Sequence, residues 1–549
     1  MPAPRHPDFP ARAGSIRRLS NSEQRYPESE KSDEGEPELE KSDGSVESGF
    51  APIRSTTADS SHLHPLHSST SRSIERSWSL NDGYSCNNTV DAEDREPEGV
   101  EFVVHWDNND PMNPRTFNTL RKWVIVAILA MGSLCATCTS SMYTVTYDQL
   151  TEEFNCSRLV ATLGLSLFIW GLGIGPLFLG PLSEFYGRRI IYIVSFSFFL
   201  IWLIPCAAAQ NIETMIVCRF INGLAGSAFL SVAGGTVGDL FDRHELSAPM
   251  MIYTSSPFIG PEVGPLVAGF VNQYTSWRWT FYVLLIWTGS LLASIILFVP
   301  ETYHPVLLRR KAQKLRKETG DDRWQAPIEK LNRSVAKTVT RSIYRPILLL
   351  TLEPMCLNLC IFSAILLGIL YLFFGAFQLV FGNVYGMELW QRGLCFLGLL
   401  VGMCFAIVSD PFWRRIYAKL EEKHEKDGGI PDDFQPEWRL PPAIAGGPLV
   451  TLGLFIFAWT IYSQVHWIVP IIGSGFFGAG TVLVYSGIFT FLVDAYPTYA
   501  ASALAANSFA RSSFGGIFPL FGIQMYNNLG YHWATSLLAF LTLIMTPFP

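Results

Sequence analysis

The stretch that decides this fold is Gly260-Pro261-Glu262-Val263-Gly264-Pro265-Leu266-Val267-Ala268-Gly269. It lies in an apolar segment, residues 249–271, that is long enough to cross a bilayer as a helix. Prolines break most helices in water, but in a membrane neighbouring helices can satisfy the carbonyl groups that proline frees. The small residues recur every four positions, so they share one face on which another helix can approach closely. The stretch therefore predicts a kinked, closely packed membrane helix that carries a carboxylate, and this combination indicates transport.

Apolar segments of spanning length follow one another along most of the chain, and they number about twelve. They are residues 123–143, 160–181, 190–209, 214–238, 249–271, 279–299, 354–380, 393–409, 442–463, 467–492, 502–524 and 533–549. We therefore expect an all-α polytopic membrane protein.

Basic residues fix the expected orientation. Residues 301–353 and the 410–440 loop are rich in Lys and Arg, which collect on the cytoplasmic side of membranes. Arg121 and Lys122, before the first segment, agree with this side. We predict that both termini are cytoplasmic, and that two six-helix bundles surround a central cavity. A single larger bundle is the alternative.

Four regions follow from this pattern. They are a disordered acidic cytoplasmic tail (1–100), an N-terminal six-helix bundle (101–300), a basic cytoplasmic linker (301–353) and a C-terminal six-helix bundle (354–549). The chain ends inside its last apolar segment, which we interpret as a truncated end. Because the tail holds 19 acidic and 11 basic residues, it accounts for the net charge of −7 of the 549 residues. Overall the chain is 49% hydrophobic and 16% charged, as expected of a membrane protein.

A short turn joins the second and third apolar segments. It reads Gly180-Pro181-Leu182-Ser183-Glu184-Phe185-Tyr186-Gly187-Arg188-Arg189. Glu184 is placed to pair with Arg188 or Arg189, and such a pair would latch two helix ends together. The turn resembles the major facilitator signature G-x-L-x-D-R-x-G-R-R, with Glu184 in place of Asp and Phe185 in place of the first Arg. The resemblance implies a gating role for Gly180, Glu184, Gly187, Arg188 and Arg189. A tight turn with a topology signal is the plainer interpretation.

Arg219 lies inside the fourth apolar segment, where a cation is costly and therefore suggests function. Its surroundings resemble the family's R-x-x-x-G-x-x-x-G segment, whose Arg is associated with proton transfer. An Arg whose side chain reaches the membrane surface is the alternative.

The opening stretch resembles motif C of proton-coupled antiporters, G-P-x-x-G-P-x-x-G-G, with Ala268 at the penultimate position. The resemblance implies export, and a packing role for Gly260, Pro261, Gly264, Pro265 and Gly269. Glu262 lies about 200° around the helix from Gly260, nearly opposite the small-residue face. We predict that Glu262 faces a polar interior and carries the coupled proton. The family signature does not require Glu at this position.

Further segments narrow the resemblance to fungal twelve-helix drug:proton antiporters. They are Asp110-Pro111-Met112-Asn113-Pro114, Trp277-Arg278-Trp279-Thr280-Phe281-Tyr282, Pro300-Glu301-Thr302-Tyr303 and Ala500-Ala501-Ser502-Ala503-Leu504-Ala505-Ala506-Asn507. The likeness covers about Val103 to Pro549. It implies proton-coupled efflux of small hydrophobic or cationic compounds, such as drugs, fungal toxins or polyamines. A proton gradient would replace any cofactor. The expected partners are a small-molecule substrate and the lipid bilayer, without nucleic acid, for a monomer in the plasma or vacuolar membrane.

Polar and aromatic residues of the second half are candidates for the substrate cavity. They are Asn358, Tyr371, Phe374, Gln378 and Asn507; Arg511 is a further polar residue in that half. Asn155 begins a glycosylation sequon on the expected outer side, whereas the sequons at Asn87 and Asn332 are expected to be cytoplasmic and unused.

Three other classes of function compete with proton-driven export: a sensor, an enzyme and a nucleotide-driven pump. A sensor built on a transporter scaffold would bind ligand without moving it, and the acidic tail would engage its partners. An enzyme is disfavoured because the chain has no H-E-x-x-H motif or nucleophile elbow, and we expect no catalytic or metal site. A nucleotide-driven pump is disfavoured because no G-x-x-x-x-G-K-[ST] loop occurs.

Overall fold

The computed structural model describes residues 102–106, 110–242, 245–330, 334–426 and 435–548. The expected disordered tail (1–100) and the sequons at Asn87 and Asn332 lie outside these residues. In the described part the fold is all-α, as the sequence predicted, and β pairing is limited to one bridge between Val103 and Gln325.

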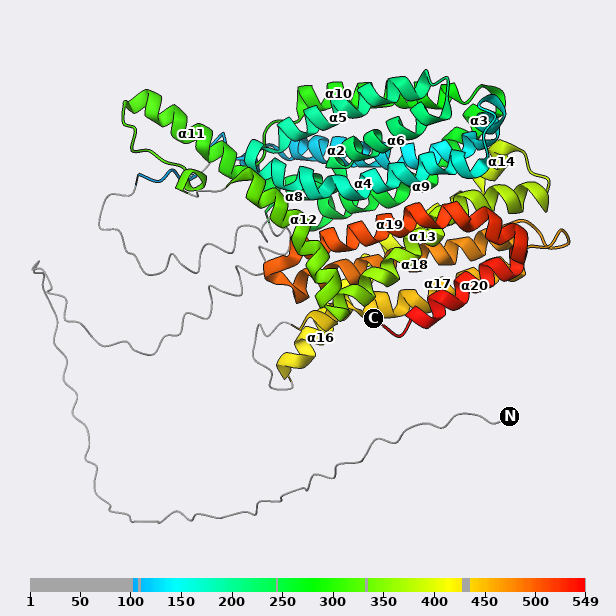
Figure 1. Cartoon of the computed structure of the whole chain (residues 1–549). Helices are drawn as coiled ribbons and strands as arrows, with labels where there is room; N and C mark the ends of the chain where they lie inside the picture. Colours follow the sequence, from blue (N-terminus) through cyan, green and yellow to red (C-terminus); the bar gives the residue numbers. More distant parts are fainter. Residues whose placement is uncertain (1–101, 107–109, 243–244, 331–333, 427–434, 549) are drawn as a thin grey trace, which may run out of the picture. The chain divides into compact units, whose positions relative to one another are not determined.

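The helices of the first half pack mainly on one another (Figure 1). They are α2 (Thr119–Met142), which continues through η4 (Tyr143–Thr146) into α3 (Tyr147–Glu153), then α4 (Arg158–Tyr186), α5 (Arg188–Ala207), α6 (Ile212–Gly226), α7 (Ala228–Ser231), α8 (Ala233–Leu240), α9 (Ser247–Tyr274) and α10 (Arg278–Phe298). Helix α9 packs along α2, α4 packs along α6, and α10 packs on α5 and α2.

The helices of the second half form another such group. They are α13 (Pro354–Asn383), α14 (Leu389–Leu394), α15 (Leu397–Val408), α16 (Asp410–Lys426), α17 (Pro441–Trp459), α18 (Ile468–Ala495), α19 (Ala500–Leu529) and α20 (Tyr531–Met545). Helix α18 packs on α17 and α15, α13 packs along α19, and α20 packs on α17. Contacts of α4 with α19, and of α9 with α14 and α15, join the two groups.

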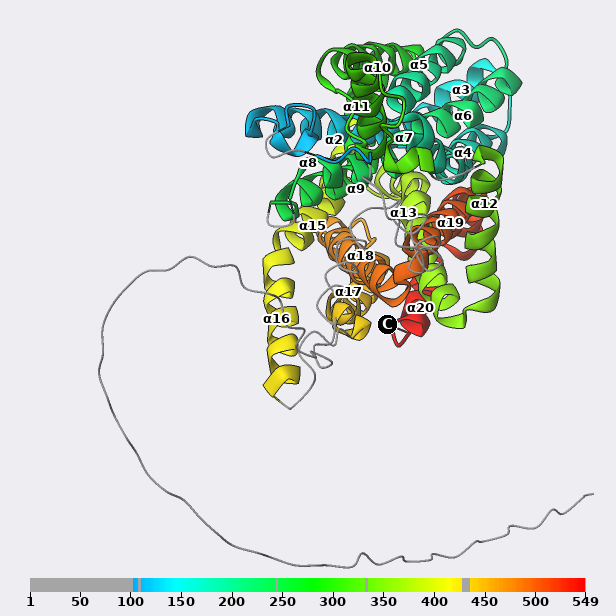
Figure 2. The same ribbon diagram turned by 90° about the vertical axis from the view of Figure 1, so that its left-hand side faces the viewer.

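The linker between the groups carries α11 (His304–Thr319) and α12 (Val335–Leu352). We call the end of the helices that carries α11 and α16 the linker end, and the end that carries α3 and α14 the far end (Figure 1). The view in Figure 2 looks from the linker end, with α9, α13 and α19 among the helices at the centre.

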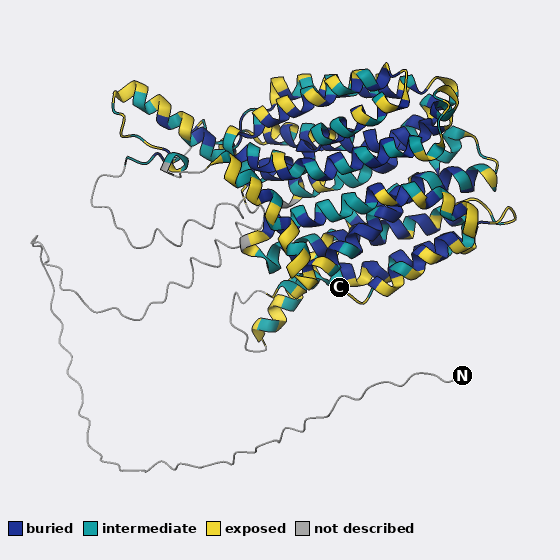
Figure 3. Ribbon diagram, viewed as in Figure 1, coloured by how far each residue is buried: buried dark blue, intermediate teal, exposed yellow. Residues whose placement is uncertain are grey.

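Nine helices in the described residues are long and apolar enough to cross a membrane. Helix α20 is apolar but shorter, and α9 and α19 have spanning length without being among the nine. All twelve predicted segments coincide with helical segments to within a few residues, except that the first continues through η4 into α3 and the eighth continues through α16. Residues inside the groups of helices are mostly buried (Figure 3). Large apolar side chains such as Ile286, Leu297 and Phe405 are exposed. Such an apolar exterior suits contact with lipid.

Candidate functional site

A cavity of about 360 Å³ lies between the two groups of helices. One wall comes from α2, α4, α7, α8 and α9, and the other comes from α13, α18 and α19. Most of its lining is apolar, for example Leu172, Phe258 and Leu370. A largely apolar cavity with a few polar groups is typical of a small-molecule site.

The cavity extends toward the linker end. Its lining includes Pro181 near the end of α4, Asp494 near the end of α18, and Ala500 at the start of α19. Ser342 of the linker helix α12 borders it as well.

Contacts between the two groups close the far end. The backbone N–H of Leu389 donates to the side-chain oxygen of Gln273 at 3.0 Å. A Cβ atom on Gly393 would lie 2.6 Å from the Pro265 carbonyl oxygen, and one on Gly269 would lie 3.1 Å from the Leu389 carbonyl oxygen. Only glycine allows α9 and α14 to approach so closely. The structure therefore shows the arrangement in which the cavity reaches the linker end and the far end is packed shut.

The motif C glycines have two different partners. Gly260 faces Thr137 of α2, and Gly264 faces Ser141 of the same helix, so these two pack within the first group. The thiol of Cys138 donates to the Gly260 carbonyl at 3.0 Å, which ties α2 to α9. Gly269, one turn beyond Pro265, is instead close to Leu389 and Trp390 of α14 in the second group. The α9 face expected to pack on a neighbouring helix thus packs on α2, and a different glycine reaches across.

Glu262 lies on α9 beside Pro261, which lines the cavity. Its side chain is 1% exposed, and neither carboxyl oxygen has a hydrogen-bond partner. The group lies within electrostatic range of Cys138 and Tyr371. A buried carboxyl without partners is costly when ionised, and such a group marks a functional site more often than a structural one.

Arg219 lies on α6 and is fully buried, so its side chain does not reach the membrane surface. Its guanidinium donates to the carbonyl oxygens of Thr139 at 3.0 Å and Gly164 at 3.4 Å. It also lies over the rings of Tyr143 at 4.3 Å and Phe168 at 4.5 Å. One terminal nitrogen has no partner, which leaves a donor available inside the first group.

Tyr371 connects the two groups beside these charges. Its hydroxyl lies 3.0 Å from the Ser140 hydroxyl of α2, so a hydrogen bond crosses from α13 to the first group. Glu262, Arg219 and Arg511 all lie within electrostatic range of Tyr371. Tyr371, which lines the cavity, is thus within electrostatic range of both predicted proton-coupling residues.

Of the other predicted cavity residues, Asn507 lines the cavity and donates to the Ser363 hydroxyl at 2.8 Å. Asn358, Phe374 and Gln378 are not among its lining residues. Helix α13 borders the cavity only around residues 367–371, so residues one or two turns before or after that span lie elsewhere. Phe374 packs against Phe396 inside the second group, with ring centres 5.4 Å apart.

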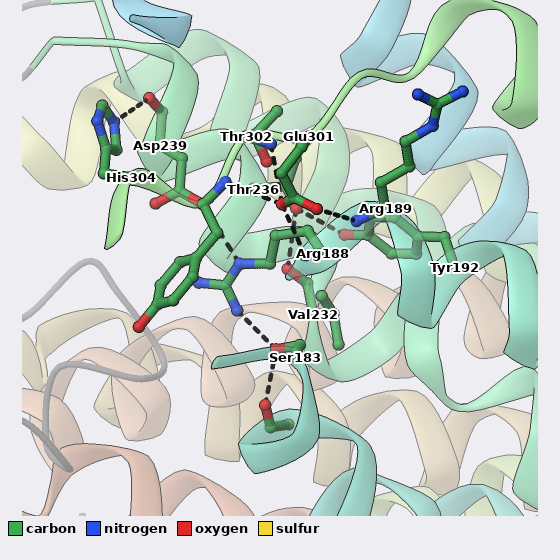
Figure 4. Close-up of polar contacts among 12 residues, drawn as sticks. Ser183, Arg188, Arg189, Tyr192, Val232, Thr236, Asp239, Glu301, Thr302 and His304 are labelled. Atoms are coloured by element: carbon green, nitrogen blue, oxygen red, sulfur yellow. Dashed lines mark hydrogen bonds and ion pairs between the residues drawn. The ribbon is translucent and has the colours of Figure 1, made fainter. Parts of the chain in front are cut away.

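The predicted latch lies at the linker end, where α4 ends and α5 begins (Figure 1), and Figure 4 shows its polar contacts. The side chain of Arg188 pairs with Asp239 of α8 at 3.3 Å and donates to the Ser183 hydroxyl at 2.8 Å. The carboxylate of Glu301 accepts the backbone N–H groups of Arg188 at 2.8 Å and of Arg189 at 3.3 Å, at the start of α5. A negative charge at a helix N-terminus is stabilising. Glu184, the partner predicted from sequence, lies within electrostatic range of Arg188.

Sequence reasoning missed Asp239 and the role of Glu301 in this cluster, which joins α4, α5, α8 and the segment after α10. Gly187 has a φ of 94°, a conformation that favours glycine, and a Cβ there would collide with the Glu301 carboxylate. Beside the cluster, the His304 ring lies 3.0 Å from the Asp239 carbonyl oxygen, and burial lowers the pKa of its imidazole. The neutral ring can donate its N–H to that carbonyl. Gly180 lines the cavity, and its carbonyl oxygen accepts a hydrogen bond from the Ser183 hydroxyl of the cluster at 2.6 Å.

Comparisons with known proteins agree with this architecture. The family model of the Major Facilitator Superfamily matches residues 129–519. The efflux pump atB of Aspergillus terreus is 57% identical over 451 residues, which cover 82% of this chain and 87% of the pump. A probable drug/proton antiporter of Saccharomyces cerevisiae is 42% identical over 452 residues, with 82% of this chain and 87% of that protein covered.

A solved structure of the proton:xylose symporter XylE of E. coli matches 79% of this chain and 96% of its own, with a TM-score of 0.56 and 15% identity. At that identity the likeness concerns the fold alone. The resemblance seen in the sequence is confirmed by the family model and by the fungal relatives. The chain belongs to the major facilitator superfamily, in the same group as these fungal transporters.

Proposed function

We propose that this integral membrane protein exports small compounds in exchange for protons, by alternating access of the cavity to the two sides of the membrane. The observation that carries the proposal is the cavity between the two groups of helices, with the unpartnered Glu262 carboxyl beside it. The names of the two curated relatives, an efflux pump and a probable drug/proton antiporter, support it.

The linker end is the cytoplasmic end in this proposal, because the basic residues of α11 and α16 lie there. Substrate then enters the cavity from the cytoplasm or the inner leaflet of the plasma membrane. Opening of the far end requires α9 and α14 to separate, and closing of the linker end brings α4 and α8 toward α18 and α19.

Glu262 couples this motion to protons. In the arrangement seen here the buried carboxyl lacks partners, and a group in this position is most stable as the neutral acid. Release of its proton therefore favours a different packing of α9, in which the carboxylate gains water or a cationic partner. Arg219 has one unpartnered nitrogen and lies within electrostatic range of Tyr371. It is the cation proposed to pair with the Glu262 carboxylate in the part of the cycle in which that group is ionised.

Expression in an efflux-deficient yeast tests the export itself. Cells that make the protein should survive higher concentrations of at least one compound in a panel of azoles, cycloheximide, polyamines and aromatic acids, and should accumulate less of it than vector controls. Protein that reaches the plasma membrane but changes neither survival nor accumulation would contradict export. Saturable ligand binding without flux would instead favour the sensor alternative.

Asn155 provides an independent prediction on orientation. It is exposed in the turn between α3 and α4 at the far end, and its sequon is Asn155-Cys156-Ser157. If the far end faces the outside, glycosidase treatment should increase the gel mobility of the wild-type protein expressed in yeast. Asn155→Gln should migrate like the treated protein. Wild-type protein that is insensitive to the enzyme would count against this orientation of the turn.

A further inference from the structure

One cationic side chain borders the cavity without a carboxylate partner. Arg511 of α19 lines the cavity, and its Nε makes no hydrogen bond. Its recorded contacts are with two rings of α18: the guanidinium carbon lies 4.7 Å from the centre of Phe489 and 5.3 Å from that of Tyr485. Such rings hold the guanidinium in place and stabilise its charge without neutralising it.

The remaining charges of the lining cancel each other. Arg439 and Asp494 border the cavity at the linker end and pair at 2.9 Å. Glu262 is buried and is not part of the lining. In the described part of the chain, the cavity wall therefore carries one net positive charge, that of Arg511.

Polar donors surround this charge on the same face of α19. Asn507, Ser508 and Ser512 all line the cavity; Asn507 and Ser508 lie four and three residues before Arg511, about one helical turn, and Ser512 directly follows it. The Tyr371 hydroxyl lies across from them on α13, within electrostatic range of Arg511. A planar guanidinium flanked by hydroxyl groups matches a carboxylate or an ionised phenol, which accept several hydrogen bonds at once.

The rest of the lining suits the body of such a molecule. Leu172, Leu230, Leu367 and Leu370 provide apolar walls, and Phe258 adds an aromatic one. A cationic substrate would lie close to an uncompensated guanidinium in a region of low dielectric, where like charges repel strongly.

We propose that the cavity binds small aromatic or apolar organic acids as their anions, and that Arg511 is the residue that selects the acidic group. This inference deepens the proposed function and rests on it only in taking this cavity as the substrate site. It replaces the cationic substrates that the family resemblance implied with anionic ones.

Charge movement follows from this assignment. Export of a monoanion in exchange for an entering proton moves two positive charges inward per cycle. An inside-negative membrane potential then drives export together with the pH gradient.

Equilibrium binding to the full-length protein in nanodiscs tests the assignment, with naphthoate and naphthamide as probes that differ mainly in charge. Wild-type protein should bind naphthoate more tightly than naphthamide by about tenfold or more. Arg511→Gln should lose that preference while keeping its affinity for naphthamide, which also reports a folded cavity. Arg511→Lys should keep part of the preference because the charge remains.

Arg414→Gln is the matched control, since it removes a cation from the half-exposed surface of α16. It should bind both probes like the wild type. Equal binding of the two probes by wild-type protein, or an Arg511→Gln variant that still prefers naphthoate, would overturn the proposal. The binding assay applies no gradient, so its result does not depend on export. Naphthoate binding through Arg511 by a protein that exports nothing in yeast would contradict export but leave the anion site in place. Export of only neutral or cationic compounds would contradict the anion site but leave the export function in place.

Discussion

Glu262→Gln protein should still bind its substrate, but it should no longer use a pH gradient to export it. Glutamine keeps the size and polarity of the neutral acid but cannot release a proton. It therefore mimics the protonated state of a carboxyl that is buried without partners on α9. In vesicles, gradient-driven accumulation by the variant should fall to the level of protein-free vesicles, whereas equilibrium binding of the substrate should persist.

Glu425→Gln makes the same chemical change on the exposed surface of α16, so it should accumulate substrate like the wild type. If Glu262→Gln retained full gradient-driven accumulation, Glu262 would not be the coupling group. The export assignment, which rests on the cavity and on the family, would survive that result.

Gly264→Val should destabilise the protein strongly, because α9 and α2 touch at this glycine. A Cβ there would collide with the Ser141 hydroxyl and would lie 3.0 Å from the Cys138 carbonyl oxygen and 3.1 Å from the Met142 nitrogen. The last two are backbone atoms of α2, which cannot rotate away, so the helices must separate. Overpacking of this kind costs about 1–3 kcal/mol, and here it also removes the tie between Cys138 and Gly260. The measurement is the midpoint of thermal unfolding in detergent.

Gly289→Val on α10 is the control, because a Cβ there meets no atom within 4 Å. Its unfolding midpoint should stay close to that of the wild type, because valine meets no neighbour there and is a slightly better helix former than glycine. Equal midpoints for the two variants would show that close packing of motif C on α2 does not stabilise this fold.

The helices themselves were predictable because the hydrophobic thickness of a membrane fixes the length of an apolar segment. Which helices pack against one another was harder to predict. The small residues at 260 and 264 predicted a close neighbour, but a glycine face does not say which helix fills it, and the structure places α2 there. The close approach across the two groups comes later on α9, where Gly269 lies beside Leu389 and Pro265 lies beside Gly393; both partners are in α14, a helix of only six residues.

The latch shows the same limit. Local reasoning paired Arg188 with Glu184, four residues away, but it could not find the ion pair with Asp239 or the Glu301 carboxylate that caps the helix, because both come from farther along the chain. The cavity candidates depended on the face of α13, a helix that is apolar all round and so gives no sign of which side borders a cavity. Tyr371 lies there and Phe374, one turn away, does not.

Proton-coupled export can be tested most directly with purified protein in sealed vesicles, oriented so that the linker end faces outward, and with an acidic interior. The proposal predicts uphill accumulation of substrate inside these vesicles, alkalinisation of the lumen as substrate enters, and loss of both when an ionophore collapses the pH gradient. Accumulation that continues unchanged after the gradient has collapsed would contradict proton coupling.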